Sequence, residues 1–375
     1  MFGITYSIQP NICIMTLMAD KKKQKRWKTA LTIVTLVALA GTAYALRSQI
    51  YETVANLGKV NTWAVFLILP LQFLNYIGQA KLYQGLFRLL GNRFRTKSMF
   101  GLSLELNFIN NVFPSGGVSG FSYISLRMKN EGISTGKAAL VQMMRFILVF
   151  MSFQVLLFSG LWMLAIVGSA SKLAVLVAAS LSTFLLAGTF MVAYLIGSKR
   201  RINDFFTFIT KLLNRLIQVV RPKHPETINV GKARNTFTEL HENYLELKSK
   251  YKQLKKPLLY ALLANVTEIA AIYVVYIAFG YYINPGAVII AYAVANFAGL
   301  VSVLPGGIGI YEILMTGVLA AGGVPPAVSL PVTVMYRIVS MGVQLPPGYF
   351  LYHRALHAEP ATQEAIEDMK EKEHF

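Results

Sequence analysis

The 375-residue chain has little cysteine and little charge. Its single cysteine, Cys13, excludes an internal disulfide and any metal cluster built from cysteine thiolates. Only 14% of the residues are charged, whereas a soluble domain of this size carries roughly a quarter. Among the charged residues, acidic ones are fewer than basic ones, with 17 against 36 lysines and arginines, which gives a formal net charge of +19. This composition excludes an ordinary soluble globular protein.

The signatures of several enzyme and pump classes are missing as well. The sequence has no P-loop, no glycine-rich dinucleotide fingerprint ahead of a soluble α/β domain, and no serine-nucleophile elbow. His353 and His357 share a helix face, but no third ligand accompanies them, so no metal site is predicted. We therefore expect no cofactor and no ATP-driven pumping by this chain alone, and we do not expect an enzyme. The basic charge accompanies no recognition motif for nucleic acid, so nucleic-acid binding is not expected either.

Long apolar runs fill most of the chain. Hydrophobic residues make up 55% of it, and runs such as 29–46 and 173–197 approach the ~20 residues that a membrane-spanning helix needs. The sequence predicts an all-α polytopic membrane protein of the cytoplasmic membrane. Six full spans are predicted at about 29–47, 62–81, 138–166, 173–197, 257–280 and 326–352, and two further apolar segments, at about 98–126 and 286–322, are interrupted.

Basic residues beside the spans predict their orientation. The basic cluster at 21–26 places the N-terminus in the cytoplasm. The apolar run that follows this cluster is longer than the core of a signal peptide, so an uncleaved first helix is expected. Basic residues also flank both ends of the first interrupted segment, which places both ends on the cytoplasmic side. The orientation is the same whether each interrupted segment is a re-entrant hairpin or two full spans. Because each arm has only about 12–20 residues, the re-entrant arrangement is favoured.

The charge and hydropathy pattern divides the chain into five parts. These are a basic cytosolic tail (1–27), a first membrane repeat (28–197), a cytosolic amphipathic insertion (198–256), a second membrane repeat (257–355) and an acidic cytosolic tail (356–375). The insertion carries two apolar stripes at helical spacing, one from Ile202 to Ile217 and one from Phe237 to Leu254. They predict a helical hairpin whose stripes pack together, and recruitment of a partner protein is the alternative.

The two interrupted segments resemble each other. Each contains a proline-glycine break at which a helix cannot continue undisturbed, formed by Pro114, Gly116 and Gly117 in the first and by Pro305, Gly306, Gly307 and Gly309 in the second. An arginine follows each break after a similar distance. In the predicted topology the copies run in opposite directions, an inverted repeat of the kind that secondary transporters use. We expect the breaks to meet near the membrane midplane and to line a water-filled cavity.

Ionisable side chains within the spans are the candidate site, because charge at membrane depth is costly and usually functional. Glu312 is expected to bind a cation, a proton or an amino headgroup, and Arg337 to hold a lipid phosphate. The alternative is that the two form a structural ion pair. Arg145 is a second candidate for phosphate binding, although it lies near enough to the cytoplasmic end to reach the interface. Glu105, Asn107, Asn110, Asn111 and Glu268 are expected to line the same cavity, with ordinary hydrogen bonding between helices as the alternative.

The second break carries a family resemblance. The run Pro305-Gly306-Gly307-Ile308-Gly309-Ile310-Tyr311-Glu312 resembles the lysylphosphatidylglycerol synthase transmembrane (flippase-like) family, and the likeness covers roughly residues 28–355. The resemblance implies a membrane domain linked to moving lipids between leaflets. Some members also carry a domain that aminoacylates phosphatidylglycerol. This chain ends at Phe375 without such a domain, so the synthase activity is not expected.

The first break departs from the second in one respect. Phe121-Ser122-Tyr123 stands where the second copy has Glu312, so a symmetric mechanism with two carboxylates is not expected. The leading hypothesis is a flippase that moves an anionic phospholipid or a polyprenyl-phosphate lipid between leaflets, with membrane lipids as its partners and Glu312 as a gate or proton-coupling group. The rival is a membrane enzyme or accessory protein acting on lipid or polyprenyl phosphates. A scaffold that works through residues 198–256 is a third possibility.

Overall fold

The computed structural model describes residues 60–113, 118–166, 171–220, 230–302 and 304–357, together with scattered positions between 33 and 58. Most of the first predicted span and nearly all of both terminal tails lie outside the described residues. So does the first break, with Pro114, Gly116 and Gly117.

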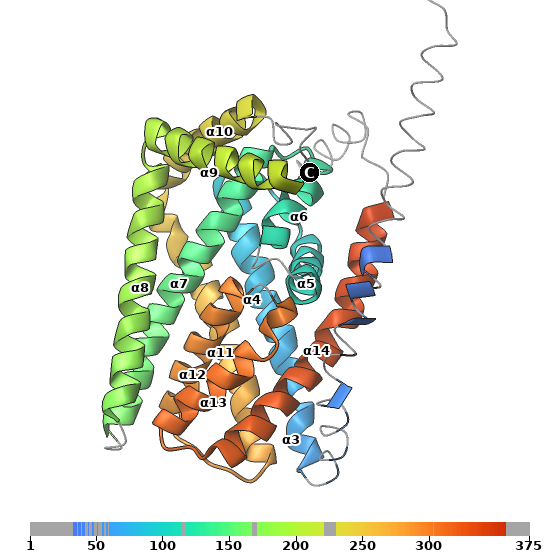
Figure 1. Cartoon of the computed structure of the whole chain (residues 1–375), viewed down its shortest axis with the longest axis vertical. Helices are drawn as coiled ribbons and strands as arrows, with labels where there is room; N and C mark the ends of the chain where they lie inside the picture. Colours follow the sequence, from blue (N-terminus) through green and yellow to red (C-terminus); the bar gives the residue numbers. More distant parts are fainter. Residues whose placement is uncertain are drawn as a thin grey trace, which may run out of the picture.

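Every regular element of the described residues is a helix (Figure 1). Five helical stretches are long and apolar enough to cross a membrane, so the chain is a polytopic membrane protein. These are α3 (Thr62–Phe66) continued by α4 (Ile68–Leu89), then α7 (Thr135–Ile166), α8 (Lys172–Ile196), α11 (Lys255–Ala278) preceded by the short helix η1 (Tyr251–Leu254), and α14 (Pro326–His357). The five predicted spans that fall on described residues are therefore confirmed as long apolar helices. The sixth, at 29–47, is not tested.

The two interrupted segments each form a pair of shorter helices. The first comprises α5 (Thr96–Val112) and α6 (Val118–Lys129), and the second comprises α12 (Pro285–Val301), the 3-10 turn η2 (Pro305–Gly307) and α13 (Ile310–Ala321). At 1.5 Å per residue, 12 to 17 residues reach only about 18–26 Å, which is less than the ~30 Å hydrocarbon core. Figure 1 shows α5 and α6 in the half of the molecule nearer α9 and α10, and α12 and α13 in the opposite half.

The helices pack in reciprocal pairs across the two halves of the chain. Helix α4 packs along α11, the first helix of the first interrupted segment (α5) packs on α14, and the corresponding helix of the second (α12) packs on α7. Glycines allow close contact in each pair. A Cβ atom on Gly78 would lie 3.1 Å from Tyr260 O, one on Gly160 would lie 3.1 Å from Gly286 O, and one on Gly348 would lie 2.8 Å from Leu104 O. Small residues at such contacts let membrane helices approach closely where no hydrophobic effect drives them together.

The polar insertion forms two helices, α9 (Lys199–Val220) and α10 (Val230–Ser249), which pack against each other at one end of the bundle (Figure 1). The stripe of α10 also packs onto the membrane helices. Leu240 and Leu247 are buried in the cluster that contains the ends of α4 and α7, and Gly136 N on α7 donates to Glu239 Oε2 at 3.1 Å. The helical hairpin is present, and it caps the bundle as well as closing on itself.

Candidate functional site

A polar cavity of about 250 Å³ lies at the centre of the bundle. Helices α4, α5, α7, α11, α12 and α14 surround it, and the second break closes part of its wall. Seven of the predicted site residues line it, namely Asn107, Asn110, Asn111, Arg145, Glu268, Gly306 and Arg337. The structure therefore brings residues from both predicted repeats to one place.

The second break forms a tight turn at the cavity wall. Gly306, Gly307 and Gly309 have φ angles of +55°, +66° and +85°, which L-residues with a side chain rarely adopt. Space is also restricted, because a Cβ on Gly306 would lie 2.9 Å from Asn111 Oδ1, and one on Gly307 would lie 3.0 Å from the Cα of Gly299. The second break thus meets the end of α5, directly before the position of the first break.

Glu312 and Arg337 form a closed ion pair beside the cavity. Arg337 Nη1 donates to Glu312 Oε1 at 2.5 Å, and Nη2 donates to the carbonyl oxygen of Gly306 at 2.6 Å. The other carboxylate oxygen, Oε2, accepts from Gly309 N at 2.8 Å at the start of α13. Both residues are buried, with 4% and 6% exposure. These contacts match the structural alternative for the pair, and Glu312 itself does not line the cavity.

Glu268 is the acid that lines the cavity. Its Oε2 accepts from Asn75 Nδ2 at 2.8 Å, and its Oε1 accepts from Gln72 Nε2 at 3.4 Å and from the Tyr336 hydroxyl. All three donors are neutral. Within the part of the chain that the structure describes, no lysine, arginine or histidine nitrogen lies within 4.0 Å of this carboxylate.

Arg145 is the cavity's more available cation. Its Nη2 makes one long hydrogen bond, at 3.4 Å, to Gln79 Oε1, and its Nε has no hydrogen-bond partner among the described residues. The guanidinium lies 5.4 Å from the ring centre of Tyr83 and 5.7 Å from that of Phe146, distances that fit cation–π contact. No described carboxylate lies within ion-pair distance of it.

A row of side-chain amides on α4 connects these two charges. Glu268 accepts from Asn75, Gln79 Nε2 donates to Asn75 Oδ1 at 2.6 Å, and Arg145 donates to Gln79. Gln72, Asn75 and Gln79 lie on one face of α4 because they are spaced by three and four residues. The sequence analysis did not single them out, although amides at helical spacing in an apolar span would have identified this face.

Further amides connect α5 to α14 at the cavity. Asn107 Nδ2 donates to the Tyr76 hydroxyl at 2.6 Å and to Gln344 Oε1 at 2.7 Å. Asn111 Nδ2 donates to Asn107 Oδ1 at 3.0 Å, whereas Asn110 Oδ1 is buried without a hydrogen-bond partner among the described residues. Counting partners from the described residues alone, the cavity therefore has an unpaired acceptor on Asn110 and an unpaired donor on Arg145.

Glu105 does not line this cavity. Its Oε2 accepts from the Tyr123 hydroxyl at 2.8 Å and lies 3.5 Å from Arg127 Nε, in a separate cluster between α5 and α6. Arg127 also pairs with Glu131 at 2.6 Å. The expectation that Glu105 shares the cavity does not match this placement, because its side chain projects from a different face of α5 than Asn107 and Asn111 do.

Comparison with known proteins identifies the family. Residues 27–348 match the family described as the lysylphosphatidylglycerol synthase TM region. The chain belongs to this family. A UPF0104 membrane protein of Methanocaldococcus jannaschii is 25% identical over 86% of this chain and 93% of its own length. UPF0104 membrane proteins of Methanothermobacter thermautotrophicus (38% identical over 21% of this chain) and Pyrococcus horikoshii (28% over 28%) match shorter segments, which span 24% and 31% of their lengths.

Proposed function

We propose that this membrane protein of the lysylphosphatidylglycerol synthase TM-region family is a lipid flippase. It moves a phosphate-bearing lipid, an anionic phospholipid or a polyprenyl phosphate, between the leaflets of the membrane. The observation that carries the proposal is the polar cavity of about 250 Å³, because it lies within a bundle of apolar helices and contains an arginine, Arg145, that has no ion-pair partner among the described residues.

Arg145 is the residue that binds the lipid phosphate. A guanidinium is a planar donor that suits two phosphate oxygens. Within the part of the chain that the structure describes, Arg145 has an unpaired Nε and one long hydrogen bond at Nη2. Arg337 is the weaker candidate because both of its terminal nitrogens already bind Glu312 and Gly306. In this role the Glu312–Arg337 pair holds the second break in shape, and gating would require the pair to open.

The arrangement of the helices supports transport. The reciprocal contacts of α5 with α14 and of α12 with α7 are those expected of an inverted repeat, with its two interrupted segments entering from opposite sides. A helix break at membrane depth is tolerated only where protein buries the backbone or where the backbone lines a water-filled cavity. In the second break, Gly307 is buried and Gly306 lines the polar cavity. Alternating access would then come from movement of one repeat against the other around the cavity.

Reconstituted liposomes test the proposal. Purified protein is placed in liposomes that contain a fluorescent analogue of phosphatidylglycerol, phosphatidylethanolamine or a polyprenyl phosphate, with and without a proton gradient. A membrane-impermeant reductant then bleaches the outer leaflet. The proposal predicts that the protein makes the inner-leaflet pool accessible for at least one of these lipids and leaves the lipid chemically unchanged. Bleaching no greater than in empty liposomes for every lipid would contradict it, and a modified lipid would support the membrane-enzyme alternative.

A further inference from the structure

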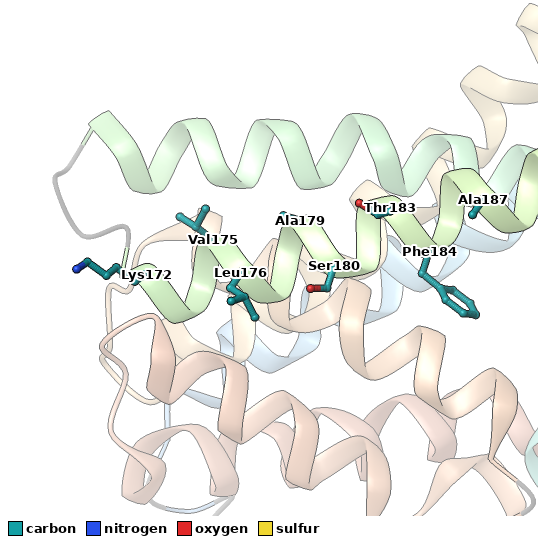
Figure 2. Close-up of a pocket in the computed structure, with 8 residues that line it drawn as sticks. All are labelled: Lys172, Val175, Leu176, Ala179, Ser180, Thr183, Phe184 and Ala187. Carbon is teal, nitrogen blue, oxygen red and sulfur yellow. The ribbon is translucent and has the colours of Figure 1, made fainter.

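A shallow, open groove of about 800 Å³ runs along the surface of α8, and all the residues that line it, from Lys172 to Ala187, belong to this one helix (Figure 2). Its lining is mostly apolar, and only 11% of the most apolar stretch of this helix is buried inside the protein. In Figure 2, Leu176, Ser180 and Phe184 project from the same side of α8, as their spacing of four residues requires. In a membrane this surface is open to the hydrocarbon of the bilayer.

A row of four aromatic rings leads from this groove to the central cavity. Phe184 lines the groove and is 61% exposed, and its ring centre lies 5.2 Å from that of Phe297 on α12. Phe297 lies 6.1 Å from Phe150, and Phe150 lies 6.2 Å from Phe146 on the same helix, α7. Phe146 lines the cavity beside Arg145, and Asn296, next to Phe297, lines it too. The groove and the cavity are thus separated by apolar side chains.

Of the helix contacts that separate the groove from the cavity, the contact between α8 and α12 is the weakest. Among the described residues no hydrogen bond joins these two helices. By contrast, α8 is fixed to α7, because Gln154 Nε2 donates to Ser182 O at 2.9 Å and Ser182 Oγ donates to Gln154 Oε1 at 2.5 Å. Its start is fixed to α13 by Ser171 Oγ, which donates to Ala321 O at 2.6 Å. Rotation of aromatic rings between α8 and α12 would therefore open a path and break no hydrogen bond.

We propose that this seam is the lateral entrance of the cavity and that the α8 groove holds a hydrocarbon tail of the lipid in transit. The lipid's phosphate passes between Phe184 and Phe297 to Arg145, while the tail stays in the groove. The inference rests on the proposed function and adds the route by which the lipid enters.

The dimensions and charge of the groove fit that occupant. Fifteen residue steps along α8 span about 22 Å, which exceeds the ~15 Å of hydrocarbon in one leaflet, so a tail can remain in the groove while its headgroup changes depth. Lys172, the first residue of α8, lines the groove (Figure 2). An ammonium there suits a lipid phosphate at the membrane surface, before it moves inward.

Reversible cross-linking tests the entrance. With Cys13→Ser as background, Phe184→Cys and Phe297→Cys are joined by a short bifunctional thiol reagent that a reductant cleaves. Translocation by these cysteine variants is measured by albumin extraction of a short-chain fluorescent lipid, because the bleaching reductant would also open the cross-link. The control pair, Gln154→Cys and Ser182→Cys, joins α8 to α7, where the native protein already holds the two helices together. Cross-linking the first pair should reduce lipid translocation to the rate of empty liposomes, and the reductant should restore it. The control pair should translocate lipid equally fast before and after cross-linking.

The outcomes separate the entrance from the flippase activity. If wild-type protein moves lipid and the cross-linked Phe184/Phe297 pair moves it as fast as its reduced form, the entrance is elsewhere and the proposed function stands. If wild-type protein moves no lipid, the proposed function fails and this inference fails with it.

A second variant serves if the double substitution is inactive before cross-linking. Phe184→Cys alone replaces an exposed side chain, and a bulky maleimide attached there should slow translocation more than a small methylthiol group does. Equal rates with both adducts would overturn the proposal.

Discussion

At the scale of single residues, the two acids near the cavity, buried Glu312 and half-buried Glu268, have different environments. Glu312 forms an ion pair with Arg337 and accepts a hydrogen bond from the backbone N–H of Gly309. Glu268 receives hydrogen bonds only from neutral side chains among the described residues. A charge at the centre of a bilayer costs about 2.5–3.5 kcal/mol by insertion measurements, so each arrangement must recover that energy locally. The closed pair recovers it through its own contacts, which makes Glu312 and Arg337 a structural unit.

Replacement of Arg337 should therefore destabilise the protein. In Arg337→Ala the Glu312 carboxylate stays buried without its cation, and removal of one partner from a buried pair typically costs about 3–5 kcal/mol. The double variant Glu312→Gln/Arg337→Met leaves no charge at this pair and should lose less stability than Arg337→Ala. Thermal unfolding of the purified variants in detergent measures both effects. A melting temperature of Arg337→Ala equal to wild type would show that the pair does not hold the break.

The role of the polar face of α4 can be tested by substituting Gln79 and measuring lipid translocation. Gln79 connects Asn75 to Arg145, so Gln79→Leu should leave Arg145 without its hydrogen bond and weaken lipid translocation. A hydrogen bond to a charged group contributes about 1.5–3 kcal/mol, and this one, at 3.4 Å, should contribute less, about 1–1.4 kcal/mol. The expected loss is therefore about five- to tenfold. Exposed Leu74, on another face of α4, provides the matched control as Leu74→Gln. Equal translocation by Gln79→Leu and wild type would remove Gln79 from the site.

At the scale of elements, the interruption between α12 and α13 follows from local chemistry. Proline and glycine end α12 and bend η2 whatever the neighbours are, so the second break could be predicted from its residues alone. The described spans could also be predicted from the sequence, because their length and hydropathy determine them. The rotation of each helix about its own axis could not. That rotation depends on contacts such as Gly348 on Leu104, and it decides that Asn107 faces the cavity while Glu105 faces Tyr123.

The break should be intolerant of a single methyl group. Gly307→Ala places a Cβ 3.0 Å from the Cα of Gly299 and forces a side chain onto a residue with φ of +66°. The backbone strain alone costs roughly 1–2 kcal/mol, so the melting temperature should fall. Gly317→Ala is the control, because a Cβ there has no neighbour within 4 Å in helix α13 and alanine favours the helix. The account is contradicted if both variants unfold at the same temperature.

At the scale of the whole molecule, the site is made of parts that are far apart in the sequence. Arg145, Glu268 and Asn111 come from three helices, and their meeting depends on α5 packing on α14 and α12 packing on α7. The sequence predicted that the two repeats would converge because the matched breaks implied it. It left two roles open for Arg337, phosphate binding and an ion pair with Glu312, and it did not separate Arg337 from Arg145, since both follow their breaks at nearly the same distance. The fold places Glu312 against Arg337 and leaves Arg145 facing the cavity without an acid among the described residues.

The rate of lipid translocation by Arg145→Ala, measured in the liposome assay, tests the central claim most directly. Loss of the charge-assisted bonds to a phosphate should slow translocation about ten- to hundredfold, and Arg145→Lys should retain part of the activity because it keeps the charge without the fork. Arg93→Ala removes an exposed arginine between α4 and α5 and should translocate lipid as wild type does. If folded Arg145→Ala moves lipid at the same rate as Arg93→Ala, the cavity does not bind the headgroup through Arg145, and the account is contradicted.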